Sequence, residues 1–153
     1  MGQRPLPDEF KEFILSLNSS NVRYLLVGGW AVGLHGSPRF TKDIDFLVAI
    51  DDDNLARLQE ALLAFGAPPV DIPRFKEKGR VIRMGSSPNQ VDIINEAAGI
   101  DINECYQRRE IINFHGADIS VISRDDLIKN KRATGRGQDL VDAEKIEKRR
   151  KDQ

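Results

Sequence analysis

The sequence predicts a mixed α/β fold, and three observations carry this prediction. Short apolar runs of strand length alternate with segments in which apolar residues recur at helical spacing. Stretches rich in glycine or proline separate these segments, as turns and loops do. The chain has 153 residues, of which 40% are hydrophobic and 31% charged, a composition that suits one globular domain. We therefore expect a single domain over residues 1–153, with residues 1–7 and 148–153 frayed.

The first predicted elements are a helix, a strand and a short helix. Residues 8–20 place apolar side chains at helical spacing behind an acidic first turn, which predicts an amphipathic helix. The apolar run over residues 22–29 predicts a buried strand. This strand ends at Gly28 and Gly29, where we expect the chain to turn into a short helix over residues 30–36.

The middle of the chain predicts three more strands and a longer helix. Residues 43–50 are apolar apart from two aspartates, which predicts a strand. Residues 51–66 predict a helix that begins at an aspartate N-cap and ends at a glycine. An irregular connection is expected over residues 67–79. Residues 81–86 and 90–96 then predict two strands joined by a Ser-Pro-Asn turn.

The last third of the chain predicts a hairpin between helices. Residues 100–110 predict a short helix. Two strands, over residues 110–114 and 118–122, flank a His-Gly-Ala turn and predict a hairpin. Residues 123–135 open with a serine and an acidic pair and stop at a glycine, as a capped helix does. Residues 137–153 predict a final helix that becomes highly charged.

Composition and charge exclude several classes of protein. The formal net charge of −1 gives no global electrostatic case for binding nucleic acid or an anionic membrane. The longest apolar stretch, residues 24–34, is interrupted by glycines and is shorter than the roughly 20 residues of a membrane-spanning helix. Cys105 is the single cysteine, and the N-terminus lacks the apolar core of a signal peptide. We therefore expect a cytoplasmic protein that does not engage a membrane.

Three aspartates within apolar strands are the candidate catalytic and metal-binding residues. Asp43 and Asp45 lie two positions apart on a predicted strand, so their side chains point to the same side. Two such carboxylates repel each other, and a divalent cation is the usual remedy. Hard oxygen ligands suit Mg²⁺ or Mn²⁺. If the strand that carries Asp92 lies beside them, Asp92 completes a cluster able to hold two metal ions around a phosphoryl group.

The glycine pair upstream of these acids is a candidate phosphate site. Gly28 and Gly29 stand at a predicted turn from strand to helix, where backbone N–H groups are available to an anion. Without a Cβ, glycine lets a phosphate approach the backbone closely. An ordinary tight turn is the competing interpretation, and the acids downstream favour phosphate binding.

These residues resemble the nucleotidyltransferase superfamily with the DNA polymerase β-like fold. The resemblance rests on LLVGGWAV at residues 25–32, RFTKDIDFLV at residues 39–48 and VDII at residues 91–94, in that order. A later segment, KNKRATGRGQDLVD at residues 129–142, resembles the lysine-rich segment of the small toxin-type and abortive-infection branch. The resemblance implies an α/β (α+β) fold with a mixed, mostly antiparallel sheet and helices largely on one face.

The resemblance also implies a reaction, in which NMP moves from a nucleoside triphosphate such as ATP to a hydroxyl acceptor. It implies that Asp43, Asp45 and Asp92 are catalytic and bind Mg²⁺ or Mn²⁺, with Asp92 on the acceptor side. The nucleotide-binding residues that it implies are Gly28, Gly29, Arg39, Thr41, Lys129 and Lys131. The acceptor is left open among a tRNA end, a protein and a small molecule, because little chain remains for a separate acceptor domain. A toxin role would bring an antitoxin partner, and a homo-oligomer is the other assembly considered.

Other interpretations of the same residues stay open. A non-catalytic nucleotide- or RNA-binding regulatory module, such as an antitoxin, could retain the fold, although it should lose one of the three acids. Basic residues over 74–83 are either a rim for RNA or a solvated loop. The acidic run of residues 51–53 is interpreted as a favourable helix start and not as a second metal site.

Overall fold

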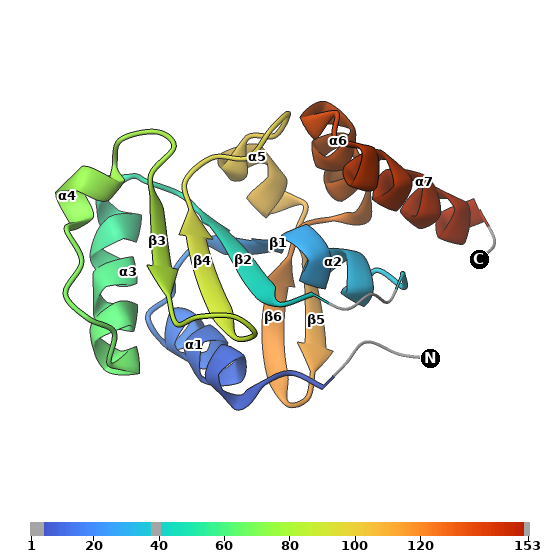
Figure 1. The fold of residues 1–153 in the computed structure, drawn as a ribbon. Helices are drawn as coiled ribbons and strands as arrows, with labels where there is room; N and C mark the ends of the chain where they lie inside the picture. The colour runs from blue at the N-terminus through green and yellow to red at the C-terminus, as the bar shows by residue number, and fades with distance from the viewer. Residues whose placement is uncertain (1–4, 38–40, 152–153) are drawn as a thin grey trace.

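The computed structural model describes residues 5–37 and 41–151, which contain seven helices and six strands (Figure 1). The strands are β1 (Tyr24–Val27), β2 (Asp43–Val48), β3 (Val81–Met84), β4 (Gln90–Ile94), β5 (Glu110–Phe114) and β6 (Ala117–Val121). They form one sheet in the order β3-β4-β2-β1-β6-β5. The pairs β1–β2, β3–β4 and β5–β6 are antiparallel, whereas β2–β4 and β1–β6 are parallel. The predicted mixed, mostly antiparallel sheet is therefore confirmed.

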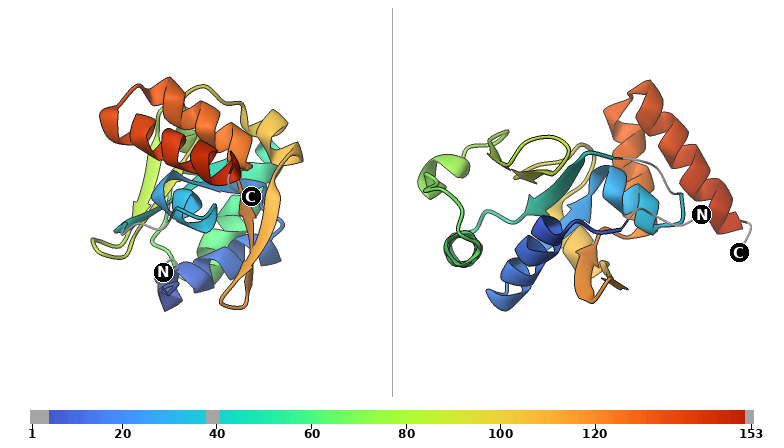
Figure 2. Two further views of the ribbon diagram at one scale, coloured as in Figure 1. Left: turned by 90° about the vertical axis from the view of Figure 1, so that its right-hand side faces the viewer. Right: turned by 60° about the horizontal axis from the view of Figure 1, so that its bottom comes forward.

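The helices lie on two sides of this sheet. Their bounds are α1 (Asp8–Ser19), α2 (Gly28–Leu34), α3 (Asp52–Phe65), α4 (Ile72–Phe75), α5 (Ile102–Gln107), α6 (Arg124–Thr134) and α7 (Gly137–Lys151). Figure 1 shows α3 at the left beside β3 and α1 at the bottom, while the α6–α7 pair lies at the upper right; Figure 2 shows the α6–α7 pair again at a distance from α1 and α3. No helix in the described part of the chain combines the length and the apolar character that crossing a bilayer requires.

The core is built between the sheet and the α1–α3 layer. Phe13 of α1 lies with its ring 5.4 Å from that of Phe46 on β2 and 5.1 Å from that of Phe65 on α3, in edge-to-face geometry. Ile44 and Phe46 are fully buried. Because side chains alternate along a strand, this packing leaves Asp43 and Asp45 on the other face of β2.

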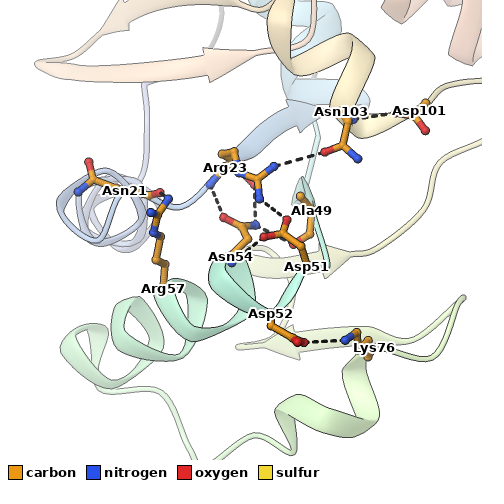
Figure 3. A network of polar contacts seen from close by, with 10 residues as sticks. All are labelled: Asn21, Arg23, Ala49, Asp51, Asp52, Asn54, Arg57, Lys76, Asp101 and Asn103. Atoms are coloured by element: carbon orange, nitrogen blue, oxygen red, sulfur yellow. Dashed lines mark hydrogen bonds and ion pairs between the residues drawn. The ribbon is translucent and has the colours of Figure 1, made fainter.

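A polar network fixes the start of α3 to the beginning of β1 (Figure 3). Asn54 is fully buried; it accepts a hydrogen bond from the Arg23 backbone N–H at 2.7 Å and donates to the carbonyls of Ala49 and Arg23. Asp51 caps α3 by accepting from the Asn54 backbone N–H and pairs with the Arg23 guanidinium. Lys76 pairs with Asp52 at 2.6 Å. This network agrees with the interpretation of residues 51–53 as a helix start.

The sequence located the main elements and missed details at their ends. Helix α2 begins at Gly28 itself, two residues earlier than expected. The expected irregular connection contains the single turn α4, which Asp71 caps by accepting from the Arg74 backbone N–H at 3.1 Å. Helices α3 and α6 end at Gly66 and Gly135, both in the left-handed conformation that favours glycine.

Candidate active site

The acidic residues of β2 and β4 lie beside one another. The two strands are parallel neighbours, and their register places Asp45 next to Asp92 and Asp43 next to Gln90. This pairing has no direct sign in the sequence, because β3 separates the two strands along the chain and lies outside them in the sheet. The structure thus brings the backbones of all three predicted acids together on one stretch of the sheet.

Gly28 lies against the carboxylate of Asp45. The antiparallel pairing of β1 and β2 places Val27 opposite Asp45, so Gly28 follows immediately at the end of β1. Gly28 has a φ of +71°, and a Cβ built there would lie 2.4 Å from Asp45 Oδ2. Both the conformation and the close approach require glycine at this position. Gly29, the second member of the pair, is buried in the first turn of α2.

A cleft of about 250 Å³ opens beside these residues. Gly28 and Asp45 line it from the sheet, and α6 and α7 line it from the opposite side. The residues contributed by these two helices and their connection are Asn130, Lys131, Thr134, Arg136 and Asp139. Larger hollows of about 640 and 300 Å³ lie along α4, and none of the three predicted acids lines them.

Asp45 carries the most unusual electrostatics of the acids at this site. Burial, together with the neighbouring carboxylates of Asp92 and Asp43, raises its pKa to about 6, while the charges of Lys131 and Arg83 act in the opposite direction. None of the described residues contributes a hydrogen bond that lowers this pKa. A half-buried carboxylate that has two acidic neighbours and lacks hydrogen-bond donors is suited to binding a cation.

The Asp92 carboxylate, by contrast, already has partners. It is buried, and its Oδ1 accepts a hydrogen bond from Arg83 Nε at 2.9 Å. The Gln90 amide donates to both oxygens, at 3.1 and 3.2 Å. Arg83 stands opposite Asp92 in the antiparallel register of β3 and β4. From the sequence, Arg83 was predicted only as a member of the basic group over residues 74–83. The predicted hairpin of β3 and β4 could have indicated its pairing with Asp92, because residues on the two strands of a hairpin lie opposite each other.

The donor chemistry of the three acids fits a divalent cation, with one qualification from their geometry. Carboxylate oxygens are the ligands that Mg²⁺ and Mn²⁺ prefer. Over residues 5–37 and 41–151, however, no three His, Cys, Asp or Glu side chains stand close enough together to hold a metal ion as placed. The hydrogen bonds of Arg83 and Gln90 give the third acid, Asp92, other partners. The pair formed by Asp43 and Asp45 therefore fits more directly than the complete triad.

The two predicted lysines occupy different surroundings. Lys131 is buried and lines the cleft, and its Nζ lies 3.0 Å from Asp139 Oδ1 and 3.5 Å from Asp142 Oδ2. Lys129 is exposed and lines a separate hollow with Arg132 and Glu147. Only Lys131 is therefore brought to the acids. Its aspartate partners were missed, because their eight- and eleven-residue separation from Lys131 spans a helix–helix turn.

The remaining predicted residues lie before β2. The Thr41 hydroxyl donates to the Asp43 backbone carbonyl at 3.2 Å, which ties the chain to the start of the strand. Arg39 falls outside the described residues. Thr41 therefore braces the backbone that carries the first acid.

The family to which the chain belongs places it in the nucleotidyltransferase class. The chain belongs to a family described as "Nucleotidyltransferase of unknown function (DUF6036)", whose model matches residues 6–148. No curated protein matches the chain.

Two solved structures resemble the chain in fold. A Thermotoga maritima protein described as a candidate nucleotidyltransferase aligns with a TM-score of 0.58 and 16% identity, over 99% of this chain and 98% of that chain. An antigenic nucleotidyltransferase-like protein from Paracoccidioides brasiliensis aligns with a TM-score of 0.52 and 18% identity, over 94% of this chain and 78% of that chain. At these identities the likeness concerns the fold.

Proposed function

We propose that this chain is a metal-dependent nucleotidyltransferase that transfers NMP from a nucleoside triphosphate to a hydroxyl acceptor. The observation that carries the proposal is the position of Asp45. Its carboxylate lies beside Gly28 and the strand that bears Asp92, and lines the cleft under α6. Burying an acid there is unfavourable for the fold, which a binding role for that acid explains.

Each residue of the site receives a role. Asp43, Asp45 and Asp92 would hold Mg²⁺ or Mn²⁺, with Asp92 on the acceptor side, and the cation would stabilise negative charge on the reacting phosphates. Gly28 and Gly29 leave their backbone open to the β and γ phosphates, Thr41 braces the start of β2, and Arg39 is proposed to bind the nucleotide. The charge of Lys131 faces the same cleft. Lys129 is exposed on another part of α6, so we assign it only a peripheral role in binding the triphosphate.

The transfer itself is an in-line exchange at the α-phosphorus. The acceptor oxygen forms a bond to this phosphorus as the bond to the pyrophosphate oxygen breaks, and pyrophosphate leaves. Asp92 takes the proton of the acceptor hydroxyl. The acceptor is a tRNA end, a protein or a small molecule, and a toxin role with an antitoxin partner belongs to the same proposal.

One observation favours a second candidate function. Because Arg83 and Gln90 occupy the Asp92 carboxylate, the third acid could serve only the fold. The chain would then be a non-catalytic nucleotide- or RNA-binding regulatory module. Such a module should bind its ligand without a divalent cation, and its RNA binding should weaken as salt rises.

Calorimetric titration with a nonhydrolysable triphosphate separates the two functions. We expect binding in Mg²⁺ that EDTA and Asp45→Asn abolish, and that Asp53→Asn leaves intact. Asp53 is a suitable control because it is an exposed acid at the start of α3. Binding that ignores both EDTA and Asp45→Asn would support the non-catalytic module instead.

A labelling experiment then tests transfer. The protein is incubated with each labelled triphosphate, cell RNA and protein extract, and the pool that becomes labelled identifies the base and the acceptor together. Asp92→Asn should reduce transfer more than it weakens triphosphate binding, because the acceptor proton matters mainly in the transition state. Equal losses in binding and transfer would contradict the role assigned to Asp92.

A further inference from the structure

The pairing between Arg83 and Asp92 joins two side chains of very different exposure. The Arg83 side chain is 61% exposed, whereas that of Asp92 is 11% exposed. Arg83 Nε lies 2.9 Å from Asp92 Oδ1, and Nη2 lies 3.5 Å from Oδ2. The guanidinium therefore reaches over the sheet from the outer strand β3 and covers a buried carboxylate.

The positive charge of Arg83 acts on the whole acidic group. Its pKa is raised by the hydrogen bond to Asp92 and by the charge of that carboxylate, and the charges of Asp43 and Asp45 add to this effect. In return, the charge of Arg83 lowers the pKa of Asp45, as that of Lys131 does. The guanidinium thus compensates negative charge at the place where a divalent cation would act.

A guanidinium and a metal ion compete for the same oxygens of Asp92. Oδ1 already accepts from Arg83 Nε and from the Gln90 amide, and Oδ2 accepts from the same two side chains. A carboxylate oxygen has two lone pairs, so little capacity remains for a third partner. A cation that binds Asp92 must therefore remove Arg83.

We propose that Arg83 is a displaceable counter-ion, which holds Asp92 in the absence of metal and leaves when a divalent cation binds that carboxylate. This inference rests on the proposed metal site. The arginine occupies an edge strand, and more than half of its side chain faces solvent, so it can turn away without disturbing the core. Binding of the cation at Asp92 and pairing with Arg83 are mutually exclusive.

The alternative is that Arg83 is a fixed clip between β3 and β4. A fixed clip would hold the hairpin together and would not respond to metal. The two roles predict opposite effects of removing the arginine. The affinity for metal rises if Arg83 is a competing counter-ion, and it stays the same or falls if Arg83 is a clip that preserves the site.

Mn²⁺ binding in the absence of nucleotide distinguishes these roles, with free Mn²⁺ followed by electron paramagnetic resonance. Arg83→Gln should bind Mn²⁺ on the order of tenfold more tightly than the original chain, because charged hydrogen bonds to Asp92 no longer have to be broken. Arg83→Lys keeps the charge and loses the fork of donors, so it should lie between the two. Arg80→Gln is the matched control, because Arg80 pairs with Glu77 and not with an acid of the site.

A double variant isolates the competition at Asp92. In an Asp92→Asn background, Arg83→Gln should leave the Mn²⁺ affinity unchanged, since the shared carboxylate is gone. Far-UV circular dichroism checks folding, and Arg83→Lys carries the test if Arg83→Gln does not fold.

Several results would overturn the inference. They are unchanged or weaker Mn²⁺ binding by both Arg83 variants, an equal gain in Arg80→Gln, or a gain that persists with Asp92→Asn. Equal Mn²⁺ binding by the original chain and the Arg83 variants refutes the counter-ion role of Arg83 and leaves the proposed metal site standing. Absence of Mn²⁺ binding to every variant refutes the metal site of the proposed function as well.

Discussion

Replacing Asp45 by asparagine should stabilise the fold at neutral pH. The folded Asp45 carboxyl has a pKa of about 6, above its ordinary value of 3.8, because it is buried beside Asp92 and Asp43. The folded protein therefore keeps this proton to a higher pH than the unfolded chain does. Stability from this group is present below about pH 4 and is lost as the pH rises to about 6. Asparagine is of similar size and does not ionise, so it escapes this loss.

The size of the effect follows from the pKa. One pKa unit corresponds to about 1.4 kcal/mol, so the rise from 3.8 to about 6 corresponds to about 3 kcal/mol at pH 7. The pKa of about 6 already includes the attraction of Lys131 and Arg83, so Asp45→Asn should gain up to about 3 kcal/mol at pH 7.

Urea denaturation between pH 3.5 and 8 in EDTA measures this difference. The free energies of unfolding of the variant and the original chain should coincide near pH 3.5 and separate above pH 6. Adding Mn²⁺ should then raise the stability of the original chain and leave Asp45→Asn unchanged, because ligands stabilise the state that binds them. A variant that is less stable at pH 7, or a difference that does not depend on pH, would refute the reasoning.

Three further substitutions test the parts of the site separately. Gly28→Ala should cost about 1 kcal/mol more than Gly135→Ala in urea denaturation, because both glycines have a φ near +70° but only Gly28 would bring a Cβ against Asp45. Lys131→Met should destabilise the protein by about 3 kcal/mol in thermal unfolding, since it leaves the buried carboxylates of Asp139 and Asp142 without their shared cation. Asn54→Ala should cost about 2 kcal/mol through its lost buried hydrogen bonds, yet calorimetry should show unchanged triphosphate binding, because Asn54 lies in the α3 network away from the cleft.

Local patterns in the sequence were enough to locate most helices and strands. The long helices were predictable from the spacing of their apolar residues and from their capping residues. Asp51 before α3 and Ser123 before α6 each accept a backbone hydrogen bond, as expected of N-caps. Helix α4 was missed because a single four-residue turn has no periodicity to detect, and its Asp71 cap stands within a proline-rich connection.

The candidate site was predictable only in part, because two different kinds of information define it. The two-residue period of a strand already placed Asp43 and Asp45 on one side. Their proximity to Asp92 depends on the parallel pairing of β2 with β4. From the sequence alone, this pairing could be assumed but not predicted. The placement of Lys131 beside Asp45 depends on how α6 crosses the end of the sheet, a tertiary feature that no local pattern encodes.

The acids elsewhere in the chain show why Asp45 is best explained by binding. Burial would raise the pKa of Asp126, but hydrogen bonds from Arg108 and Ser123 hold it below its usual range. Asp139 behaves alike, since Thr134 and Lys131 outweigh the effect of its burial. Asp45 instead has a raised pKa. Gly28, which lacks a Cβ, leaves room beside its carboxylate. The cations that act on it, Arg83 and Lys131, are paired with Asp92 and Asp139. Within residues 5–37 and 41–151, Asp126 and Asp139 have such partners, whereas the raised pKa of Asp45 at the cleft supports the proposal that this acid binds a cation.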